Sequence, residues 1–90
     1  MKKLTTGQTN LLKEFNLATF SQDEPRTITR YNRFGMGSVV VNKLEAGLYD
    51  SSIAIFEQYE RGEKANIAKA DRLKYLLCKI NSEAYMTLID

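Results

Sequence analysis

Hydrophobic residues near the start of the chain recur with the spacing of a helix. Thr5 and Gln8 precede most of them as a capping box, in which the Thr5 hydroxyl accepts from the Gln8 amide and the Gln8 side chain reaches back to the cap. We therefore expect a helix that ends at about Phe20, followed by a polar linker over residues 21–25, where Pro25 disfavours helix. The apolar stripe of this predicted helix comprises Leu11, Leu12, Phe15, Ala18 and Thr19.

The most regular helical pattern lies in the C-terminal half of the chain. It begins at Lys64 or Ala65, and no glycine or proline interrupts it before Asn81. Residues 84–89 then alternate well enough to form a third strand of a sheet, but Ser82 as N-cap would equally start a short terminal helix. The long helix would bury one continuous stripe, formed by Ile67, Ala70, Leu73, Leu77 and Ile80.

Residues 50–61 fit two patterns. Ile53 and Ile55 begin an alternation that suits a strand. The flanking residues favour a helix, because an N-cap side chain is available at position 50 or 51 and Gly62 can occupy the position just after the last turn. We predict a helix here, preceded by a turn over residues 45–49.

The stretch from Arg26 to Leu44 has the composition of a β-hairpin. Both arms are rich in β-branched and aromatic residues, and the glycines between them supply the positive φ that a turn needs. We favour a three-residue loop of Gly35, Met36 and Gly37, which pairs Phe34 with Ser38, Asn32 with Val40 and Ile28 with Leu44. A two-residue loop, Gly35-Met36, would shift every cross-strand pair by one. The favoured register directs Ile28, Phe34, Val40 and Leu44 to the core and leaves Tyr31, Arg33, Val39 and Val41 on the other face.

Together these elements predict a small α+β protein. It would contain a two- or three-stranded antiparallel sheet built on the central hairpin (about residues 26–44), with one helix before it and two helices after it. The chain has 90 residues, of which 43% are hydrophobic and 27% are charged. This composition supports one modest core and differs from that of disordered chains, so we expect a single compact domain over residues 1–90.

Several classes of site are excluded by residues that the sequence lacks. It contains no histidine and one cysteine, Cys78, which rules out an internal disulfide and the common zinc and thiol–imidazole sites. We therefore expect no metal and no cofactor. The chain has no apolar run of about eighteen residues, and its first residues lack the apolar core of a signal peptide, which predicts a cytoplasmic protein that does not enter a membrane.

Charge is segregated along the chain. Residues 25–44 carry four positive charges and no acidic residue, whereas residues 45–63 carry a net charge of −4. In the simpler interpretation the two blocks neutralise each other, and in the other they face two different partners. Guanidinium groups also bind phosphate and aromatic rings stack on unpaired bases, so the hairpin qualifies as a nucleic-acid surface. The candidate binding residues, for protein or nucleic acid, are Arg26, Arg30, Tyr31, Arg33, Phe34, Lys43, Lys69, Arg72 and Lys79.

Catalytic patterns are weak in this sequence. Residues 34–38 do not match a phosphate-binding glycine loop, since Val40 stands where a third glycine is needed and no lysine–serine pair follows. Cys78 has no histidine base and lies within a predicted helix, where we expect a small, partly buried hydrophobic residue. Glu57 and Glu60 lie one turn apart, which is ordinary for surface glutamates. We predict that the protein is not an enzyme.

The leading functional hypothesis is a small non-enzymatic interaction protein, such as a regulator or inhibitor that occupies another protein's surface. An RNA- or DNA-binding module that uses the arginine-rich hairpin is the alternative. An enzyme subunit whose site is completed by another chain is a third interpretation. A small chain of this composition also suits a phage or a mobile element, although no single residue demonstrates it.

Overall fold

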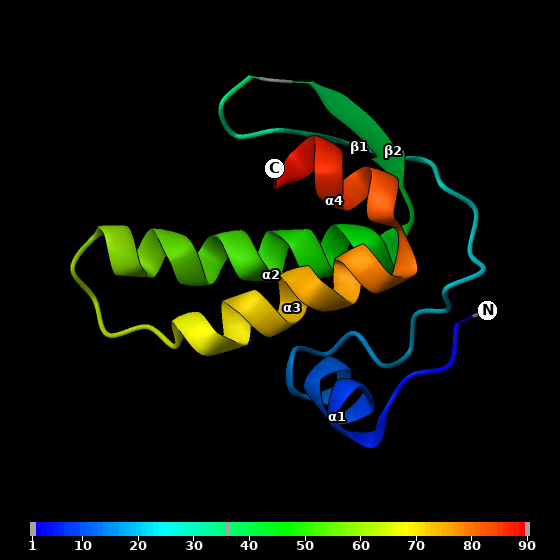
Figure 1. Cartoon of the computed structure of the whole chain (residues 1–90), viewed down its shortest axis with the longest axis horizontal. Helices are drawn as coiled ribbons and strands as arrows, with labels where there is room; N and C mark the ends of the chain where they lie inside the picture. Colours follow the sequence, from blue (N-terminus) through cyan, green and yellow to red (C-terminus); the bar gives the residue numbers. More distant parts are fainter. Residues whose placement is uncertain (1, 36, 90) are drawn as a thin grey trace.

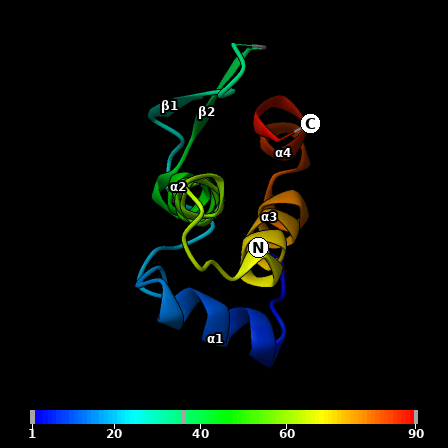
Figure 2. The ribbon, with the colours of Figure 1, turned by 90° about the vertical axis from the view of Figure 1, so that its left-hand side faces the viewer.

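The computed structural model, which describes residues 2–35 and 37–89, contains four helices and one β-hairpin. α2 and α3 lie side by side and antiparallel in the middle of the molecule (Figure 1). α1 crosses them on one side, while the hairpin and α4 cover the other side (Figure 2). In chain order the elements are α1 (Thr6–Glu14), β1 (Ile28–Tyr31), β2 (Ser38–Val41), α2 (Lys43–Glu60), α3 (Ile67–Ile80) and α4 (Ser82–Leu88).

The predicted α+β class is confirmed, with one helix before the hairpin, but three helices follow it rather than two. The difference lies in the tail, which forms α4 and not a third strand, so that the sheet in the described residues has two strands. The N-cap of α4 is Asn81, one residue before the predicted Ser82, and its Oδ1 accepts from the Ala84 amide at 3.1 Å. The Asn81 side chain thus satisfies a backbone amide at the start of α4 from within the same segment of the chain.

α1 begins as predicted and ends earlier than predicted. The capping box of Thr5 and Gln8 is present. The helix stops at Glu14 rather than Phe20, because Asn16 adopts a positive φ of 60°. The amide of Leu17 then donates to the Leu12 carbonyl at 2.8 Å, which is the bond that closes a Schellman motif. Asparagine tolerates a positive φ better than most residues do, so Asn16 itself is the local signal that ends α1.

The N-cap of α2 lies eight residues before Asp50, the earlier of the two predicted N-caps, and the predicted turn over residues 45–49 is wrong. Asn42 is the N-cap, and it forms a capping box with Glu45 in which both reciprocal hydrogen bonds measure 2.9 Å. Gly47 lies inside the helix. A Cβ at Gly47 would overlap Cδ2 of Leu17, so this glycine permits close packing of the preceding loop on α2 and does not mark a turn. The predicted end is confirmed, since Gly62 follows the C-cap with a φ of 77°.

Replacing Gly47 with alanine should therefore lower the free energy of unfolding by about 1 to 3 kcal/mol, because Leu17 would have to move. Gly7→Ala is the matched control, since it also lies in a helix but its nearest neighbour would be Thr5 Oγ1 at 3.9 Å. That change should be neutral or stabilise the protein by up to about 1 kcal/mol. Urea denaturation of both variants measures the difference. A gain in stability at both positions would contradict the packing of Leu17 on α2.

The observed hairpin register differs from both predicted registers. β1 pairs with β2 so that Ile28 lies opposite Val41 and Tyr31 lies opposite Ser38. Residues 32–37 connect the strands, and Met36 of the predicted three-residue loop lies outside the described residues. Moving the register by an odd number of residues exchanges the faces of one strand. Val39 and Val41 consequently face the helices, whereas Phe34 and Val40, both predicted for the core, are exposed.

The contacts of Asn32 explain why the connection between β1 and β2 is longer than the predicted three-residue loop. The Asn32 carbonyl accepts from the Gly35 amide at 2.9 Å and its Oδ1 accepts from the Phe34 amide at 2.7 Å, which together form a tight turn. Its Nδ2 donates to the carbonyl of Thr87 in α4 at 3.0 Å. Asn32 is buried by these contacts, so α4 helps to fix where β1 ends.

The core lies between the central helices and is closed by the other elements. The predicted stripe of α3 is confirmed for Ala70, Leu73, Leu77 and Ile80, which are buried, while Ile67 is half-buried. Leu44 was expected in the hairpin and reaches the core from the first turn of α2 instead. The largest fully buried apolar side chains are Val41, Leu44, Leu48, Leu73, Leu76 and Leu77.

Candidate functional site

Each arginine of the hairpin region donates to a carboxylate of α2. Arg30 makes two bonds to Asp50, at 3.0 and 2.8 Å, and the Nη2 of Arg33 lies 2.7 Å from Oε1 of Glu60. Hydrogen bonding to Asp50 raises the pKa of Arg30 above its ordinary value. The basic and acidic blocks thus neutralise each other across the hairpin and α2, as the simpler interpretation of the sequence predicted.

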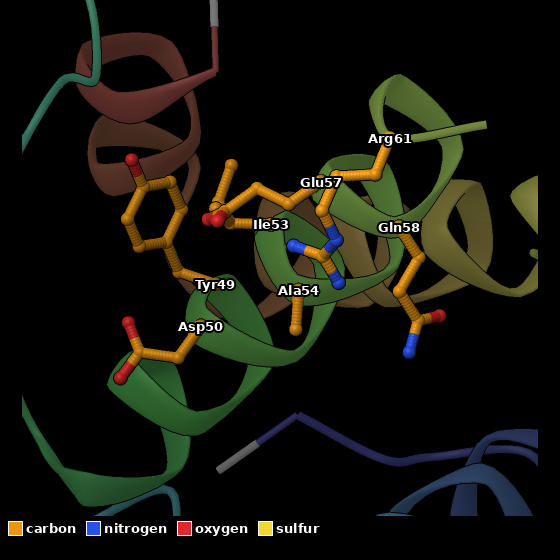
Figure 3. Close-up of a pocket in the computed structure, with 7 residues that line it drawn as sticks. All are labelled: Tyr49, Asp50, Ile53, Ala54, Glu57, Gln58 and Arg61. Atoms are coloured by element: carbon orange, nitrogen blue, oxygen red, sulfur yellow. The ribbon is translucent and has the colours of Figure 1, made fainter. Parts of the chain in front are cut away.

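An open groove of about 380 Å³ runs along α2 beside the Arg30–Asp50 pair. Burial raises the pKa of the Tyr49 phenol, and its hydroxyl donates to the Tyr31 carbonyl at 3.1 Å. The charged groups of the groove are the carboxylates of Asp50 and Glu57 and the guanidinium of Arg61. Figure 3 shows the lining side chains, which are Tyr49, Asp50, Ile53, Ala54, Glu57, Gln58 and Arg61.

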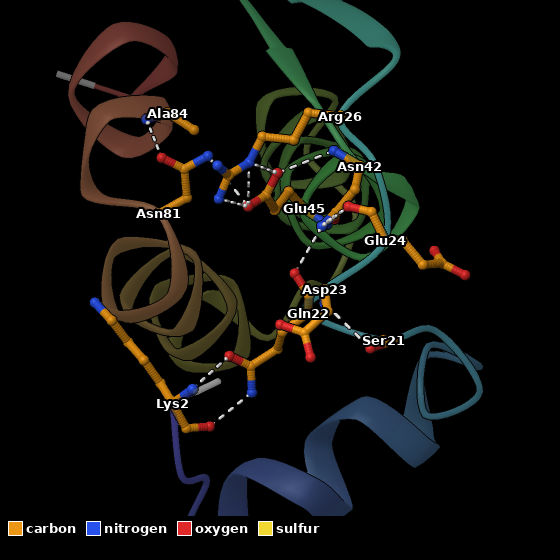
Figure 4. A network of polar contacts seen from close by, with 10 residues as sticks. All are labelled: Lys2, Ser21, Gln22, Asp23, Glu24, Arg26, Asn42, Glu45, Asn81 and Ala84. Atoms are coloured by element: carbon orange, nitrogen blue, oxygen red, sulfur yellow. Dashed lines mark hydrogen bonds and ion pairs between the residues drawn. The ribbon is translucent and has the colours of Figure 1, made fainter.

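Arg26 belongs to a different, buried network around Glu45 (Figure 4). The Glu45 side chain is fully buried, and its carboxylate accepts from Arg26 Nη2 at 2.9 Å, from the Asn42 amide at 2.9 Å and from Asn81 Nδ2 at 3.1 Å. These donors come from the linker before β1, the start of α2 and the start of α4. Because the contacts with Arg26 and Asn81 join the linker before β1 and the start of α4 to α2, we interpret Arg26 as a structural residue.

The predicted binding residues of α3 lie apart from the hairpin. Lys69 Nζ forms an ion pair with Glu14 at 2.6 Å, and Lys79 Nζ donates to Gln8 Oε1 at 3.0 Å. Arg72 borders a hollow that also contains Gln8. Both Glu14 and Gln8 belong to α1, which covers the side of the central helices opposite the hairpin (Figure 2). The candidate residues therefore divide into two surfaces and do not form one basic face. Lys43, exposed at the first position of α2, joins neither.

Arg33 and Phe34 are brought together with side chains of α2 and α3. The guanidinium carbon of Arg33 lies 5.5 Å from the ring centroid of Phe34 and 4.9 Å from that of Phe56. Lys74 Nζ lies 5.6 Å from the centroid of Phe56. Phe56 also stacks on Tyr59, with centroids 6.4 Å apart. We call Arg33, Phe34, Phe56, Tyr59 and Lys74 the aromatic cluster.

The aromatic cluster is largely open to solvent. Phe34 is 77% exposed and Tyr59 is 59% exposed, which is unusual for large aromatic side chains on a small protein. Tyr31 (68%) and Val40 are also exposed, on the outer face of the hairpin. Exposed apolar patches are typical of surfaces that contact another molecule, and Phe34 and Tyr59 both belong to the cluster.

Sequence analysis identified Arg33 and Phe34 of this cluster and missed its other members. Phe56 and Tyr59 are three residues apart on a helix, and this spacing was a detectable signal. Lys74 had no such signal, because only the packing of α3 on α2 brings it to Phe56.

Other kinds of site are not found in the described part of the chain. Within residues 2–35 and 37–89, no three acidic or cysteine side chains are grouped so that they could hold a metal ion. Cys78 is half-buried on α3. None of the helices there combines the length and the apolar character needed to cross a bilayer. Comparisons of the chain with family models, with curated proteins and with solved structures give no match, so its own geometry has to indicate its function.

Proposed function

We propose that this protein is a small, non-enzymatic, cytoplasmic regulator or inhibitor that binds another protein through the aromatic cluster. The observation that carries the proposal is the position of Arg33, whose guanidinium lies against the rings of Phe34 and Phe56 while Phe34 remains exposed. Arginine and tyrosine are among the residue types that contribute most to binding energy at protein interfaces, and phenylalanine is enriched there.

The contacts of Arg33 favour binding because they restrict its side chain before any partner arrives. The guanidinium is held by two rings and by Glu60, whose carboxylate lies 2.7 Å away. A side chain that is already ordered loses less conformational entropy when it enters an interface. The exposed ring faces of Phe34 and Tyr59 would supply the apolar area that such an interface buries.

The nucleic-acid alternative requires cations that are available to phosphate. Arg26, Arg30 and Arg33 already donate to carboxylates, and these carboxylates would lie beside a bound phosphate and repel it. A protein partner needs no such rearrangement, because exposed rings contact it directly. The pairing of the arginines thus supports the protein-binding proposal over the alternative.

Affinity purification from cells with the full chain as bait tests this proposal, followed by measurement of the dissociation constant for any captured protein. Phe34→Ala or Tyr59→Ala should weaken binding by about 2 kcal/mol or more, which is roughly 30-fold. Arg33→Lys should restore little of the binding lost in Arg33→Ala, because a lysine lacks the planar group that stacks on the rings. Tyr75→Ala is the control, since Tyr75 is 67% exposed on α3 near α1, away from the cluster.

The same purified protein also tests the nucleic-acid-binding alternative. Co-purifying RNA or DNA, or binding to either at physiological salt that is lost when Arg30 and Arg33 are both changed to alanine, would contradict the proposal. Equal effects of the Tyr75 and Tyr59 changes on a captured protein would also contradict it.

A further inference from the structure

A small pocket opens beside the aromatic cluster, where the hairpin loop meets α2, α3 and the end of α4. Its volume is about 130 Å³. Its apolar walls are Ile53, Phe56, Leu88 and Ile89.

The volume and lining of the pocket suit one apolar side chain. An apolar cavity of about 150 Å³ is large enough to bind benzene, so a pocket of this size has room for a single aliphatic or aromatic group. Leu88 is buried and Ile53 and Ile89 are half-buried, which leaves an apolar surface that a partner can cover. Phe34, which is 77% exposed, also lines the pocket and leaves its ring available to an occupant.

Two cationic side chains, Arg33 and Lys74, lie at the rim of the pocket, and they differ in whether a carboxylate binds them. Arg33 is held by Glu60, at 2.7 Å, and by the two flanking rings. Lys74 lies on Phe56, and among residues 2–35 and 37–89 no carboxylate approaches its Nζ within the 4.0 Å of an ion pair. Its ammonium can therefore donate to an incoming group, and the complementary group is a carboxylate.

We propose that this pocket receives one apolar side chain from an acidic segment of a partner protein, with a neighbouring Asp or Glu carboxylate bound to Lys74. The inference rests on the proposed function and specifies the chemistry of the partner. The apolar side chain would fill the space between Phe56 and Leu88, and the carboxylate would lie over the rim. Charge complementarity selects this occupant, because Arg33 and Lys74 outnumber the single carboxylate of Glu60 that pairs with Arg33, which leaves Lys74 to bind an acidic group and to repel a basic segment.

Amide chemical-shift titration of the full-length chain with four short, end-capped peptides tests the proposal. The first peptide has a phenylalanine between two pairs of aspartates. In the second the aspartates are replaced by asparagines, in the third by lysines, and in the fourth alanine replaces the phenylalanine. The acidic phenylalanine peptide should shift the amides of Phe34, Phe56, Lys74 and Ile89. The asparagine peptide should bind about 3- to 10-fold more weakly, and the other two should cause no shifts at these positions.

Two variants test whether Lys74 is the residue that binds the carboxylates of the acidic peptide. Lys74→Gln should reduce the affinity for the acidic peptide to that of the asparagine peptide and leave the asparagine peptide unaffected. Lys13→Gln is the control, since Lys13 is an exposed lysine on α1, and it should change neither affinity. Equal binding of the acidic and asparagine peptides, or no shifts at millimolar peptide, would overturn the proposal.

The outcomes separate this inference from the function on which it rests. A partner protein that is lost with Phe34→Ala and retained at full affinity with Lys74→Gln would leave protein binding in place and overturn the acidic-segment proposal. Peptide binding as described, with no cellular protein captured, would support the chemistry of the pocket and count against the proposed function.

Discussion

Replacing Glu45 with alanine should lower the free energy of unfolding by about 2 to 4 kcal/mol, because its fully buried carboxylate accepts charge-assisted hydrogen bonds that are lost, whereas its half-exposed partner Arg26 can be solvated once it is unpaired. The Glu45 carboxylate is fully buried and binds Arg26, the Asn42 amide and Asn81. Without it, the Asn42 amide remains buried with no acceptor, and the linker before β1 and the start of α4 lose their shared contact with α2. Small proteins are stable by only about 5 to 15 kcal/mol, so a loss of this size is a large fraction of the total free energy of unfolding.

Glu60→Ala provides the matched control for Glu45. It also removes a glutamate of α2 that pairs with an arginine, but this side chain is 49% exposed. Exposed ion pairs contribute about 0 to 1 kcal/mol, so the effect should be small. Chemical denaturation followed by circular dichroism measures both variants. Equal, small losses would show that the Glu45 network does not hold the linker before β1, α2 and α4 together.

Leu73→Ala or Leu77→Ala should each lower the free energy of unfolding by about 2 to 5 kcal/mol. Both side chains are completely buried between α2 and α3, where the surrounding helices cannot collapse fully into the space that alanine would leave. Each change therefore loses the transfer free energy of the removed methyl groups and adds a cavity.

Lys79→Ala, on the same helix, is the comparison for these two variants. It loses one hydrogen bond, to Gln8 at 3.0 Å, and should cost about 1 kcal/mol or less. The midpoint of urea denaturation orders the three proteins. If Lys79→Ala were as damaging as Leu77→Ala, the core-facing side of α3 would be wrongly assigned.

Helix signals that act within a few residues could be interpreted from the sequence. Thr5 with Gln8 capped α1, Gly62 ended α2, and the stripe through Leu73 and Leu77 gave the core face of α3. The missed boundaries at Asn16 and Asn42 were also local, since each asparagine satisfies backbone groups at the helix end beside it. Better interpretation of these two asparagines would have given the correct limits of α1 and α2.

About half of the aromatic cluster could be predicted in the same way. Arg33 and Phe34 were identified because they are adjacent in an arginine-rich hairpin. Phe56 and Tyr59 lie on one side of α2, but only their contact with Arg33 distinguishes them from ordinary surface residues. The sequence also does not indicate which carboxylate pairs with each of the three arginines. The acidic block contains five carboxylates, and the structure shows that Glu45, Asp50 and Glu60 are the partners.

The sequence by itself determined the α+β class, the capped ends of several helices and the absence of histidine chemistry, because each depends on residue type or on neighbours in the chain. The tertiary structure alone decided the close packing at Gly47 and the hairpin register. Leu17 packs where Gly47 has no side chain, and α4 binds Asn32. It also decided that Lys74 reaches Phe56. These contacts join residues far apart in sequence, and their free energy exists only after the chain has closed the intervening loops.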